Sequence, residues 1–316
     1  MKKQYTAFIF LLVSGFFFVK HFSGNQQPTD AAQPPKATVG ESPEASSTRA
    51  ETQTSIASLK TITASSTPIS AKSFISEIVD VDGNARIIKK KNPSLRLPIA
   101  SVTKLMTAIV AANNYNPSEE ITVPKQAADT KGSSGKLKPG QIFFIGDILY
   151  SLLIESDNDA GITLASKMEA GKFVELMNRE AWKLGLYNTH YVNPTGLDPD
   201  DGSKPNYSTA EDVAKLAVEI IQKYPNILRI MSLKTFDLRT ASGTLHHTLE
   251  TTNKLLGENI PFKILGGKTG ETPMAKKNLL LISYGPQENS YLVNVVLGSD
   301  DNFGDMKKLL IFSISE

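Results

Sequence analysis

A serine and a lysine three positions apart are the clearest chemical signal in this sequence. Ser101 follows the apolar residues Pro98-Ile99-Ala100, and Lys104 lies where a helical pattern begins. Three residues are close to one helical turn, so we expect the Ser101 hydroxyl and the Lys104 amine to share one face. The amine could then take the hydroxyl proton, and the helix N-terminus would favour the oxyanion formed next. The pair therefore predicts an activated serine nucleophile.

Two further motifs make this interpretation specific. Ser-x-x-Lys alone is a weak signal, because the same spacing recurs at Ser133-Ser134-Gly135-Lys136, where no helix start is visible. However, Ser156-x-Asn158 follows an apolar helical segment, and Lys268-Thr269-Gly270 lies on a strand after two glycines. A Lys-Thr-Gly triplet arises by chance in about one chain of this size in ten, so the ordered set is far more specific than any one motif.

The three motifs and their flanks resemble the serine D-alanyl-D-alanine carboxypeptidases. The flanks are PIASVTKLMTA, LLIESDNDA, NPTGL, NYSTAEDVA and GGKTGET. This family, peptidase family S11, comprises low-molecular-mass penicillin-binding proteins with the β-lactamase/transpeptidase-like fold. The resemblance covers about residues 71–316. It implies removal of the terminal D-Ala from peptidoglycan stem peptides, β-lactam antibiotics as covalent inhibitors, and neither a metal nor an organic cofactor.

The resemblance also implies a role for each motif residue. Ser101 would attack the carbonyl of the penultimate D-Ala, Lys104 would act as the base, and Ser156 would pass a proton to the leaving D-alanine. A basic Lys104 needs a pKa well below its reference of ~10.4, and burial beside Lys268 would lower it. The substrate-binding residues would be Asn158, Lys268, Thr269 and Gly270, and the oxyanion hole would be formed by the backbone N–H groups of Ser101 and Glu271.

Two acidic residues depart from the pattern of many relatives. Asp157 stands between Ser156 and Asn158, where many relatives have glycine. Glu271 follows the Lys-Thr-Gly triplet, where several relatives have histidine or another non-acidic residue. We expect the charge of Asp157 near Lys104 to alter the pH dependence, and Glu271 leaves the substrate preference open.

Three other functions compete with this assignment. A D,D-endopeptidase would cut peptidoglycan crosslinks with the same site, and the sequence does not separate the two because the choice depends on the shape of the groove. A class A β-lactamase is disfavoured, since we find no Glu-x-x-x-Asn segment between the second and third motifs. A catalytically silent wall-binding protein on the same fold would require decayed motifs, yet every motif side chain is present.

Length and composition are those of a soluble globular protein. The 316 residues are 40% apolar and 21% charged, enough for one large domain or two small ones. The net charge of +2 is too small to indicate a nucleic acid partner. There is no cysteine, which excludes disulfides, thiolate metal sites and cysteine nucleophiles. The sequence gives no basis for predicting an oligomeric state.

The first 70 residues are expected to lie outside the catalytic domain. Residues 1–24 are typical of a signal or anchor, because two lysines precede the apolar run AFIFLLVSGFFFV. No convincing cleavage site follows, so we expect an N-terminal membrane anchor and an extracytoplasmic domain in the cell envelope, secreted if the segment is cleaved. Residues 25–70 are rich in Ser, Thr, Ala, Pro and Gln, which is typical of a disordered linker. The catalytic domain is expected over 71–316.

Strand patterns at both ends of this domain and helical patterns in its middle predict an α+β fold. Strands are expected at 73–81, 85–90, 235–240, 245–250, 262–270, 278–284 and 291–298, and helices at 101–112, 148–154, 161–168, 172–184, 208–222 and 305–312. An antiparallel sheet would then be built from both ends of the domain and packed against a helical cluster.

Several residues outside the motifs are expected to have structural roles. Met177 and Trp182 are expected in the core. Ser208 is expected to cap the helix that follows it, with Glu211 at the capping-box position. The first assignment predicts which face of the helix at 172–184 is buried, and the second predicts where the helix at 208–222 begins.

Two groups of potential metal ligands are assigned to structure instead. His246 and His247 are expected to point to opposite faces of a strand, without a partner cluster. Asp198, Asp200 and Asp201 are interpreted as turn residues, because Gly202 stands where a calcium loop would need its third oxygen ligand.

Overall fold

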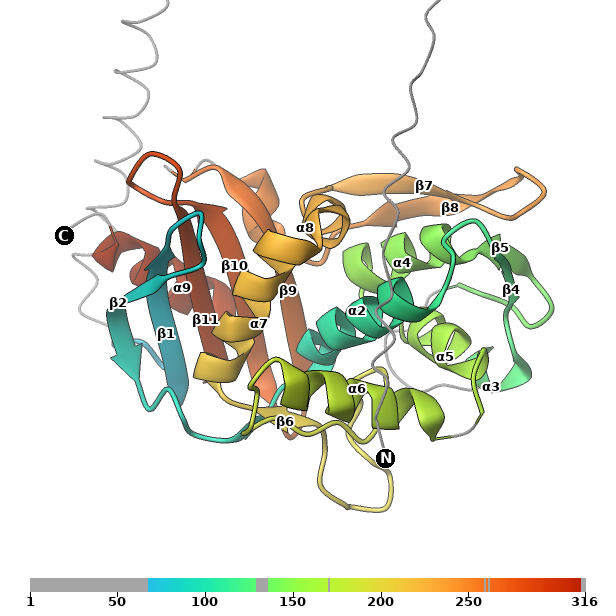
Figure 1. Ribbon diagram of the computed structural model, residues 1–316, viewed down its shortest axis with the longest axis horizontal. Helices are drawn as coiled ribbons and strands as arrows, with labels where there is room; N and C mark the ends of the chain where they lie inside the picture. The colour runs from blue at the N-terminus through green and yellow to red at the C-terminus, as the bar shows by residue number, and fades with distance from the viewer. Residues whose placement is uncertain (1–67, 129–135, 170, 259, 261, 314–316) are drawn as a thin grey trace, which may run out of the picture. The chain divides into compact units, whose positions relative to one another are not determined.

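The computed structural model describes residues 68–313, apart from 129–135, 170, 259 and 261 (Figure 1). The expected anchor over 1–24 and nearly all of the expected linker over 25–70 lie outside the described residues. Among the helices of the described part, none is long and apolar enough to cross a membrane.

A five-stranded antiparallel sheet joins the two ends of the domain. Its strands run in the order β2-β1-β11-β10-β9. They are β1 (Ser73–Val79), β2 (Ala85–Lys91), β9 (Ile264–Thr272), β10 (Lys276–Tyr284) and β11 (Tyr291–Ser299). β1 pairs with β11, with Ser73 opposite Leu297 and Val79 opposite Tyr291. The predicted α+β fold is therefore confirmed, and β9, which carries the Lys-Thr-Gly triplet, is an edge strand of this sheet.

Both faces of the sheet are covered, as the alternation along β1 shows. Successive side chains of a strand point to opposite faces. Phe74 and Ile78 join an apolar cluster with α9 (Asn302–Phe312), whereas Ile75 and Val79 join the larger core with α7 (Ala210–Lys223). Figure 1 shows α7 and α9 on opposite faces of the sheet. Burial on both faces explains the continuous apolar runs of β10 and β11.

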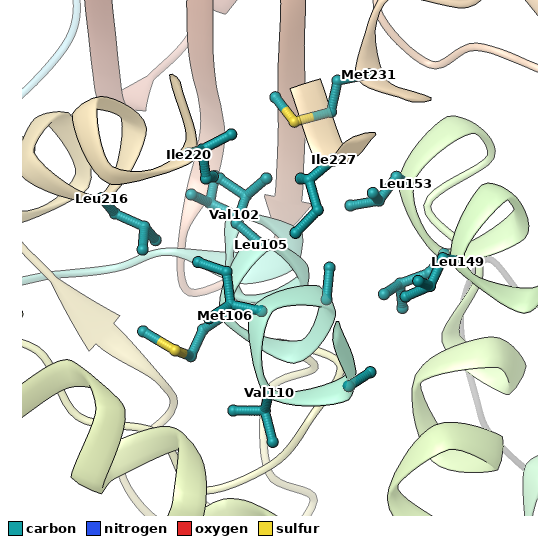
Figure 2. Close-up of a cluster of buried hydrophobic side chains, with 14 of the residues drawn as sticks. Val102, Leu105, Met106, Val110, Leu149, Leu153, Leu216, Ile220, Ile227 and Met231 are labelled. Carbon is teal, nitrogen blue, oxygen red and sulfur yellow. The ribbon is translucent and has the colours of Figure 1, made fainter. Parts of the chain in front are cut away.

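The helix α2 (Lys104–Asn114) is the centre of the helical cluster. Every residue from Lys104 to Ala111 is buried. Figure 2 shows its apolar side chains among those of α4 (Ile145–Ile154), α7 and α8 (Pro225–Met231). The labelled residues are Val102, Leu105, Met106, Val110, Leu149, Leu153, Leu216, Ile220, Ile227 and Met231. Because each buried Leu or Ile contributes about 1.5–3 kcal/mol, this packing fixes the start of α2, where Ser101 and Lys104 lie.

The remaining elements of the described part are short or lie at the margins of the cluster. The short strands are β3 (Leu97–Pro98) paired with β6 (Tyr207–Ser208), β4 (Glu120–Thr122) paired with β5 (Ile142–Phe144), and the hairpin of β7 (Thr235–Arg239) with β8 (Leu245–Glu250). The other helices are η1 (Ala100–Thr103), α3 (Lys125–Ala128), α5 (Asn158–Ser166), α6 (Lys172–Lys183) and η2 (Lys254–Gly257). The expected helices at 148–154, 161–168 and 305–312 begin three residues earlier, and α8, which starts at a proline, was not expected.

The prediction that Trp182 is a core residue is wrong. Trp182 is 69% exposed, whereas Met177 is fully buried as expected. The buried face of α6 is formed by Phe173, Leu176, Met177 and Ala181. At about 100° per residue, Trp182 lies roughly opposite Phe173 on the helix, so the same packing that buries Phe173 directs Trp182 to solvent.

The predicted cap of α7 is displaced by one residue. Thr209 is the N-cap, and its hydroxyl accepts a hydrogen bond from the backbone N–H of Asp212 at 3.0 Å. Ser208 instead ends β6. Glu211 does not close a capping box on Ser208, but accepts a hydrogen bond from the Ser94 hydroxyl at 3.1 Å. Two neighbouring hydroxyl residues offer the same capping chemistry, and the pairing of β6 decides between them.

The prediction that His246 and His247 point to opposite faces is also wrong. His247 pairs with Leu238 and Leu245 pairs with Arg239, so the register shifts between these positions. His246 is therefore the extra residue of a β-bulge, which breaks the strict alternation of side chains. The two rings contact each other, with their Nδ1 atoms 2.7 Å apart.

Candidate active site

The amine of Lys104 forms the centre of the candidate site. Its Nζ atom lies 2.7 Å from Ser101 Oγ, 2.7 Å from Asn158 Oδ1 and 2.8 Å from the carbonyl oxygen of Thr195. The Thr195 carbonyl and Asn158 Oδ1 can only accept hydrogen bonds, so they take two N–H groups of Lys104. In the neutral amine the remaining position is a lone pair, and it is directed at the Ser101 hydroxyl. This is the geometry of a general base beside its nucleophile.

Burial makes the neutral form of Lys104 accessible. The side chain has no exposed surface. Burial lowers the pKa of Lys104 to about 7, and the nearby Asp157 carboxylate opposes this shift. A substantial fraction of the Lys104 amine is therefore unprotonated at neutral pH, as a base requires. The Asp157 carboxylate stabilises the charged form of the Lys104 amine and thereby raises its pKa, which is the influence that we expected from this residue.

A second buried lysine contacts the predicted proton shuttle. Lys268 Nζ donates to Ser156 Oγ at 2.7 Å and to the Thr269 carbonyl at 3.1 Å. Burial, and then the charge of Lys104, hold the pKa of Lys268 well below its usual range. For Lys104 itself, burial alone lowers the pKa, so the expected contribution of Lys268 to that shift is not found. The two amines repel each other, which disfavours the doubly protonated pair.

A strained turn between α4 and α5 positions Ser156 and Asn158. Ser156 has a φ of 63°, in the left-handed region that residues other than glycine seldom adopt. Asp157 is the N-cap of α5, where its carboxylate accepts from the backbone N–H of Asp159 at 2.8 Å. The same carboxylate accepts from the Ser151 hydroxyl of α4 at 2.7 Å. Asp157, where many relatives have glycine, therefore ties the two helices together across the motif.

Gly270 allows β9 to lie directly against the nucleophile. A Cβ atom on Gly270 would lie 2.7 Å from the Ile99 carbonyl oxygen and 3.1 Å from the backbone nitrogen of Ser101. No larger residue fits this approach without displacing η1 or the strand. The absence of a side chain thus brings the backbone of Gly270 and Glu271 beside Ser101, next to the proposed oxyanion position.

A cleft of about 630 Å³ opens over these groups. The predicted residues that line it are Ser101, Ser156, Asn158, Thr269, Gly270 and Glu271. Lys104 and Lys268 lie beneath its floor, 0% and 1% exposed. All predicted site residues therefore come together at one place. The competing Ser-x-x-Lys match lies outside the described residues except for Lys136, which is 3.6 Å from Glu155.

The loop that supplies the Thr195 carbonyl was not recognised as part of the site from its sequence. Asn193 Oδ1 accepts from the backbone N–H groups of Thr195 at 3.1 Å and Gly196 at 2.7 Å, which closes the loop on itself. Gly196 has a φ of 86°, and a Cβ there would lie 2.0 Å from the Ala100 carbonyl oxygen. The Asn-Pro-Thr-Gly turn chemistry is the one sequence signal from which a fixed loop at this place could have been inferred.

Two other residues contribute in ways that the sequence did not indicate. The hydroxyl of Thr252 lies 2.7 Å from that of Thr269 and lines the same cleft. Asp198, which we interpreted as a turn residue, accepts hydrogen bonds from Thr272 Oγ1 at 2.8 Å and from the Met274 N–H at 3.0 Å. Asp198 thus fastens the loop after Thr195 to the β9–β10 turn. In the described residues, no three His, Asp or Glu side chains are grouped so as to hold a metal ion.

Known proteins share both the sequence pattern and the fold. The profile of a family described as D-alanyl-D-alanine carboxypeptidase matches residues 60–301. The D-alanyl-D-alanine endopeptidase of Pseudomonas aeruginosa is 34% identical over 212 residues, which cover 65% of this chain and 66% of that protein. The carboxypeptidase DacF of Bacillus subtilis is 30% identical over 241 residues, covering 73% and 59%. The chain thus spans about three-fifths to two-thirds of the length of these curated relatives.

Solved structures of penicillin-binding proteins have the same fold. Penicillin-binding protein D2 of Listeria monocytogenes, in its ampicillin-bound form, superposes with a TM-score of 0.65 at 27% identity, over 78% of this chain and 98% of that chain. Penicillin-binding protein 5 of Haemophilus influenzae superposes with a TM-score of 0.68 at 27% identity, over 79% and 72%. The family match, the fold and the assembled motifs agree, and this chain belongs to the D-alanyl-D-alanine carboxypeptidase family, the S11 peptidases.

Proposed function

We propose that this protein is a serine D,D-carboxypeptidase that removes the terminal D-Ala from peptidoglycan stem peptides. The observation that carries this proposal is the geometry of Lys104, whose two obligatory acceptors leave its third position directed at Ser101 Oγ. A serine in contact with a buried amine of lowered pKa is equipped for acyl transfer. We also propose that β-lactams acylate the same serine, in line with the ampicillin-bound relative.

Acylation follows from the contacts of Ser101 and Lys104. Ser101 Oγ attacks the carbonyl carbon of the penultimate D-Ala as its proton passes to Lys104 Nζ. The backbone N–H groups of Ser101 and Glu271 would stabilise the resulting oxyanion, and the close approach of Gly270 supports that placement. As the amide C–N bond breaks, Ser156 Oγ gives its proton to the leaving amine and takes one from Lys268 Nζ, which donates to it at 2.7 Å. Water then hydrolyses the ester on Ser101 and releases the shortened peptide.

Recognition of the free chain end falls to β9. The Thr269 hydroxyl lines the cleft and can donate to the terminal carboxylate. Lys268 supplies a positive charge behind it when its buried amine is protonated, and a bound carboxylate would favour that protonated form. Asn158 would position both Lys104 and the substrate amide, which its contact with Lys104 Nζ supports.

The proposal is tested by release of D-alanine. The full chain and its Ser101→Ala variant are incubated with a synthetic pentapeptide that ends in D-Ala-D-Ala, and free D-alanine is measured. We expect release by the parent and none above background by the variant. Absence of release by the folded parent, with β-lactam labelling intact, would refute the carboxypeptidase assignment. Silence of the folded parent in both assays would favour a catalytically silent wall-binding protein.

A D,D-endopeptidase is the second candidate, and the sequence identities of the relatives favour it. The relatives named D-alanyl-D-alanine endopeptidase from Pseudomonas aeruginosa and Haemophilus influenzae are each 34% identical to this chain, whereas the carboxypeptidase DacF is 30% identical. The same acyl transfer on Ser101 would serve both reactions. Turnover of a crosslinked muropeptide dimer with a higher kcat/KM than that of the pentapeptide would select the endopeptidase.

We further propose that the catalytic domain over 71–316 lies outside the cytoplasm in the cell envelope. An anchor at 1–24 and a linker over 25–70 would hold it near a membrane, and the apolar run after two lysines supports this. Fractionation of cells that express the full chain tests the tether, and N-terminal sequencing shows whether the segment is cleaved. Recovery of the chain in the cytoplasmic fraction would contradict the proposal.

A further inference from the structure

Four exposed lysines gather at one corner of the five-stranded sheet. Lys89, Lys90 and Lys91 end the edge strand β2, and Lys72 directly precedes β1. Asn92 Nδ2 donates to the Lys72 carbonyl at 3.1 Å, which brings the two segments together. We call these four lysines the lysine corner. None of them takes part in the acylation step.

The positive charge of the lysine corner is not balanced by neighbouring carboxylates. Within the described part of the chain, none of the four lysines has a carboxylate oxygen within 4 Å of its Nζ atom. By contrast, every lysine of α6, α7 and α9 has such a partner. Asp300, on which Lys72 exerts an electrostatic influence, is already bound by Lys276 at 2.7 Å. Asp80 and Asp82 belong to the turn at the other end of β2.

Lysines on an edge strand also have an ordinary structural role. They discourage pairing with the edge strand of another molecule. That role explains charge along the open edge of β2. It does not explain Lys72, which lies outside the strands, or the run of three lysines at one end of β2. The lysine corner therefore fits a partner that carries negative charge.

The lysine corner is also the place where the chain enters the domain. Lys91 Nζ donates to the Ala71 carbonyl at 2.9 Å. The Ala71 N–H donates to the buried carboxylate of Asp305 at 2.9 Å, so the entry point is fixed. The proposed anchor at 1–24 and linker over 25–70 directly precede this point. A flexible linker of that length has an end-to-end distance of about 40 Å, which keeps the corner near the anchoring surface.

We propose that the lysine corner docks on the anionic lipid headgroups of the membrane that holds the N-terminal anchor. This inference rests on the proposed anchor. Each exposed lysine adds a weak attraction to an anionic surface. The tether raises the effective concentration of that surface to about the millimolar range, at which weak contacts are sufficient.

Docking through β2 has a consequence for the active site. β2 and β9 are the two edges of the sheet, with three strands between them. At about 4.8 Å per strand, the cleft beside β9 then lies about 19 Å from the edge that contacts the lipid. The docked domain presents its cleft to the wall rather than to the lipid surface.

The test measures how closely each end of the domain approaches a lipid surface. The full chain has no cysteine, so one introduced cysteine carries a single donor fluorophore. Ile87→Cys labels β2, and Ser242→Cys labels the turn of the β7–β8 hairpin, which lies at the opposite end of the domain from β2 (Figure 1). Both residues are exposed. Energy transfer is measured to an acceptor at the headgroups of vesicles made of phosphatidylcholine, alone or mixed with phosphatidylglycerol.

We expect energy transfer from position 87 to be at least about twofold higher on the anionic vesicles than on the neutral ones, with a much smaller change at position 242. Salt at about 1 M should abolish the difference, because the Debye length falls to about 3 Å. Lys89→Gln/Lys90→Gln should remove it as well. Lys172→Gln/Lys183→Gln is the matched control, because it removes the same charge from paired lysines of α6, and it should keep the parental difference.

Equal transfer from position 87 on the two kinds of vesicle, or an equal gain at both positions, would overturn the proposal. An unchanged difference in Lys89→Gln/Lys90→Gln would overturn it too. Flotation with phosphatidylcholine vesicles reports the anchor by itself, so a chain that floats without a gain at position 87 refutes the corner alone, and a chain that floats with neither kind of vesicle refutes both. No measurement here involves D-alanine release, so failure of the corner remains distinct from failure of the proposed activity.

Discussion

The two walls of the active-site cleft are built in opposite ways. On the helical wall, Lys104 and Asn158 are 0% and 3% exposed and are bonded to each other. On the strand wall, Thr269 is partly exposed and Glu271 is exposed to the cleft. The hydroxyl of Thr269 has the hydroxyl of Thr252 as a neighbour at 2.7 Å. The helical wall thus presents buried groups with fixed partners, whereas the strand wall presents Thr269 and Glu271 to the cleft above the buried Lys268.

This difference assigns different tasks to the walls. Buried groups with fixed partners need no reorganisation when charge develops, so the helical wall is suited to bond making and breaking. Groups in contact with water exchange partners at low cost, so the strand wall is suited to substrate selection. Changes on the helical wall should therefore lower kcat, whereas changes on the strand wall should mainly raise KM or alter the preferred peptide.

The largest effect is expected from Ser101→Ala. Removal of the nucleophile should reduce D-alanine release by at least about 10⁴-fold, because no other hydroxyl in the site contacts Lys104. Ser133→Ala, in the second Ser-x-x-Lys match, is the matched control and should leave the rate unchanged. Steady-state release of D-alanine by both variants makes the measurement. Retained activity in Ser101→Ala would break the assignment of the helical wall to catalysis.

Lys104→Gln should be the next most severe change. Glutamine keeps a polar group near Asn158 but has no basic lone pair, so the acylation rate should fall by about 10²–10⁴-fold. Rapid-mixing measurement of β-lactam acylation gives the rate directly. Lys183→Gln, an exposed lysine paired with Glu180 on α6, serves as the control and should acylate like the parent. Equal rates for the two variants would remove Lys104 from the mechanism.

The pH dependence sharpens the comparison on the helical wall. Since burial lowers the pKa of Lys104 to about 7, the acylation rate should rise as pH increases through that value and the amine loses its proton. Asp157 opposes the shift, so Asp157→Asn should lower the pKa of Lys104 and move the rising limb to lower pH. Asparagine keeps the N-cap of α5, which limits structural damage. If the pH profile of the acylation rate in Asp157→Asn stays in place or moves to higher pH, the influence of Asp157 on the pKa of Lys104 is contradicted.

Gly270→Ala should affect the junction between the two walls. The added methyl would lie 2.7 Å from the Ile99 carbonyl oxygen, so the strand must shift away from Ser101. We expect acylation to slow by about tenfold or more and the free energy of unfolding to fall by about 1–3 kcal/mol. Gly257→Ala is the matched control, because no atom lies within 4 Å of its added carbon. Identical kinetics and melting temperatures for the two variants would refute the close approach.

The smallest effect is expected on the strand wall, from Thr252→Val. The substitution removes the hydroxyl beside Thr269 while keeping its shape. Loss of about 1 kcal/mol of hydrogen bonding should raise KM for the pentapeptide by about fivefold, with kcat within about twofold. Thr252→Ser keeps the hydroxyl and should restore the parental KM. A fall in kcat with an unchanged KM would reverse the assignment of this wall.

The parts of the site that the sequence predicted are those written in short motifs. Ser101 and Lys104 share one turn, so their contact follows from helix geometry alone. The triplet Lys268-Thr269-Gly270 could be placed on a strand because the strand-like run over 262–267 leads directly into it. The prediction that this triplet lies beside Ser101 came from the family resemblance. No local rule relates residues so far apart in the chain.

The parts that were missed depend on contacts between distant segments or on small shifts of phase. The Thr195 carbonyl and the Thr252 hydroxyl carry no motif of their own, and their roles appear only when the chain is folded. Trp182 was placed in the core by its residue type, although the helical phase set by Phe173 directs it outwards. A one-residue bulge brought His246 against His247, and alternation alone does not predict a bulge.

The most direct test of the central claim is to map the site of acylation. The full chain is incubated with a β-lactam, digested, and the modified peptide is identified by mass spectrometry, beside Ser101→Ala treated in the same way. We predict one adduct, on the peptide that carries Ser101, and none on the variant. An adduct on the peptides that carry Ser156 or Ser133, or an adduct that persists in the folded Ser101→Ala variant, would contradict the account.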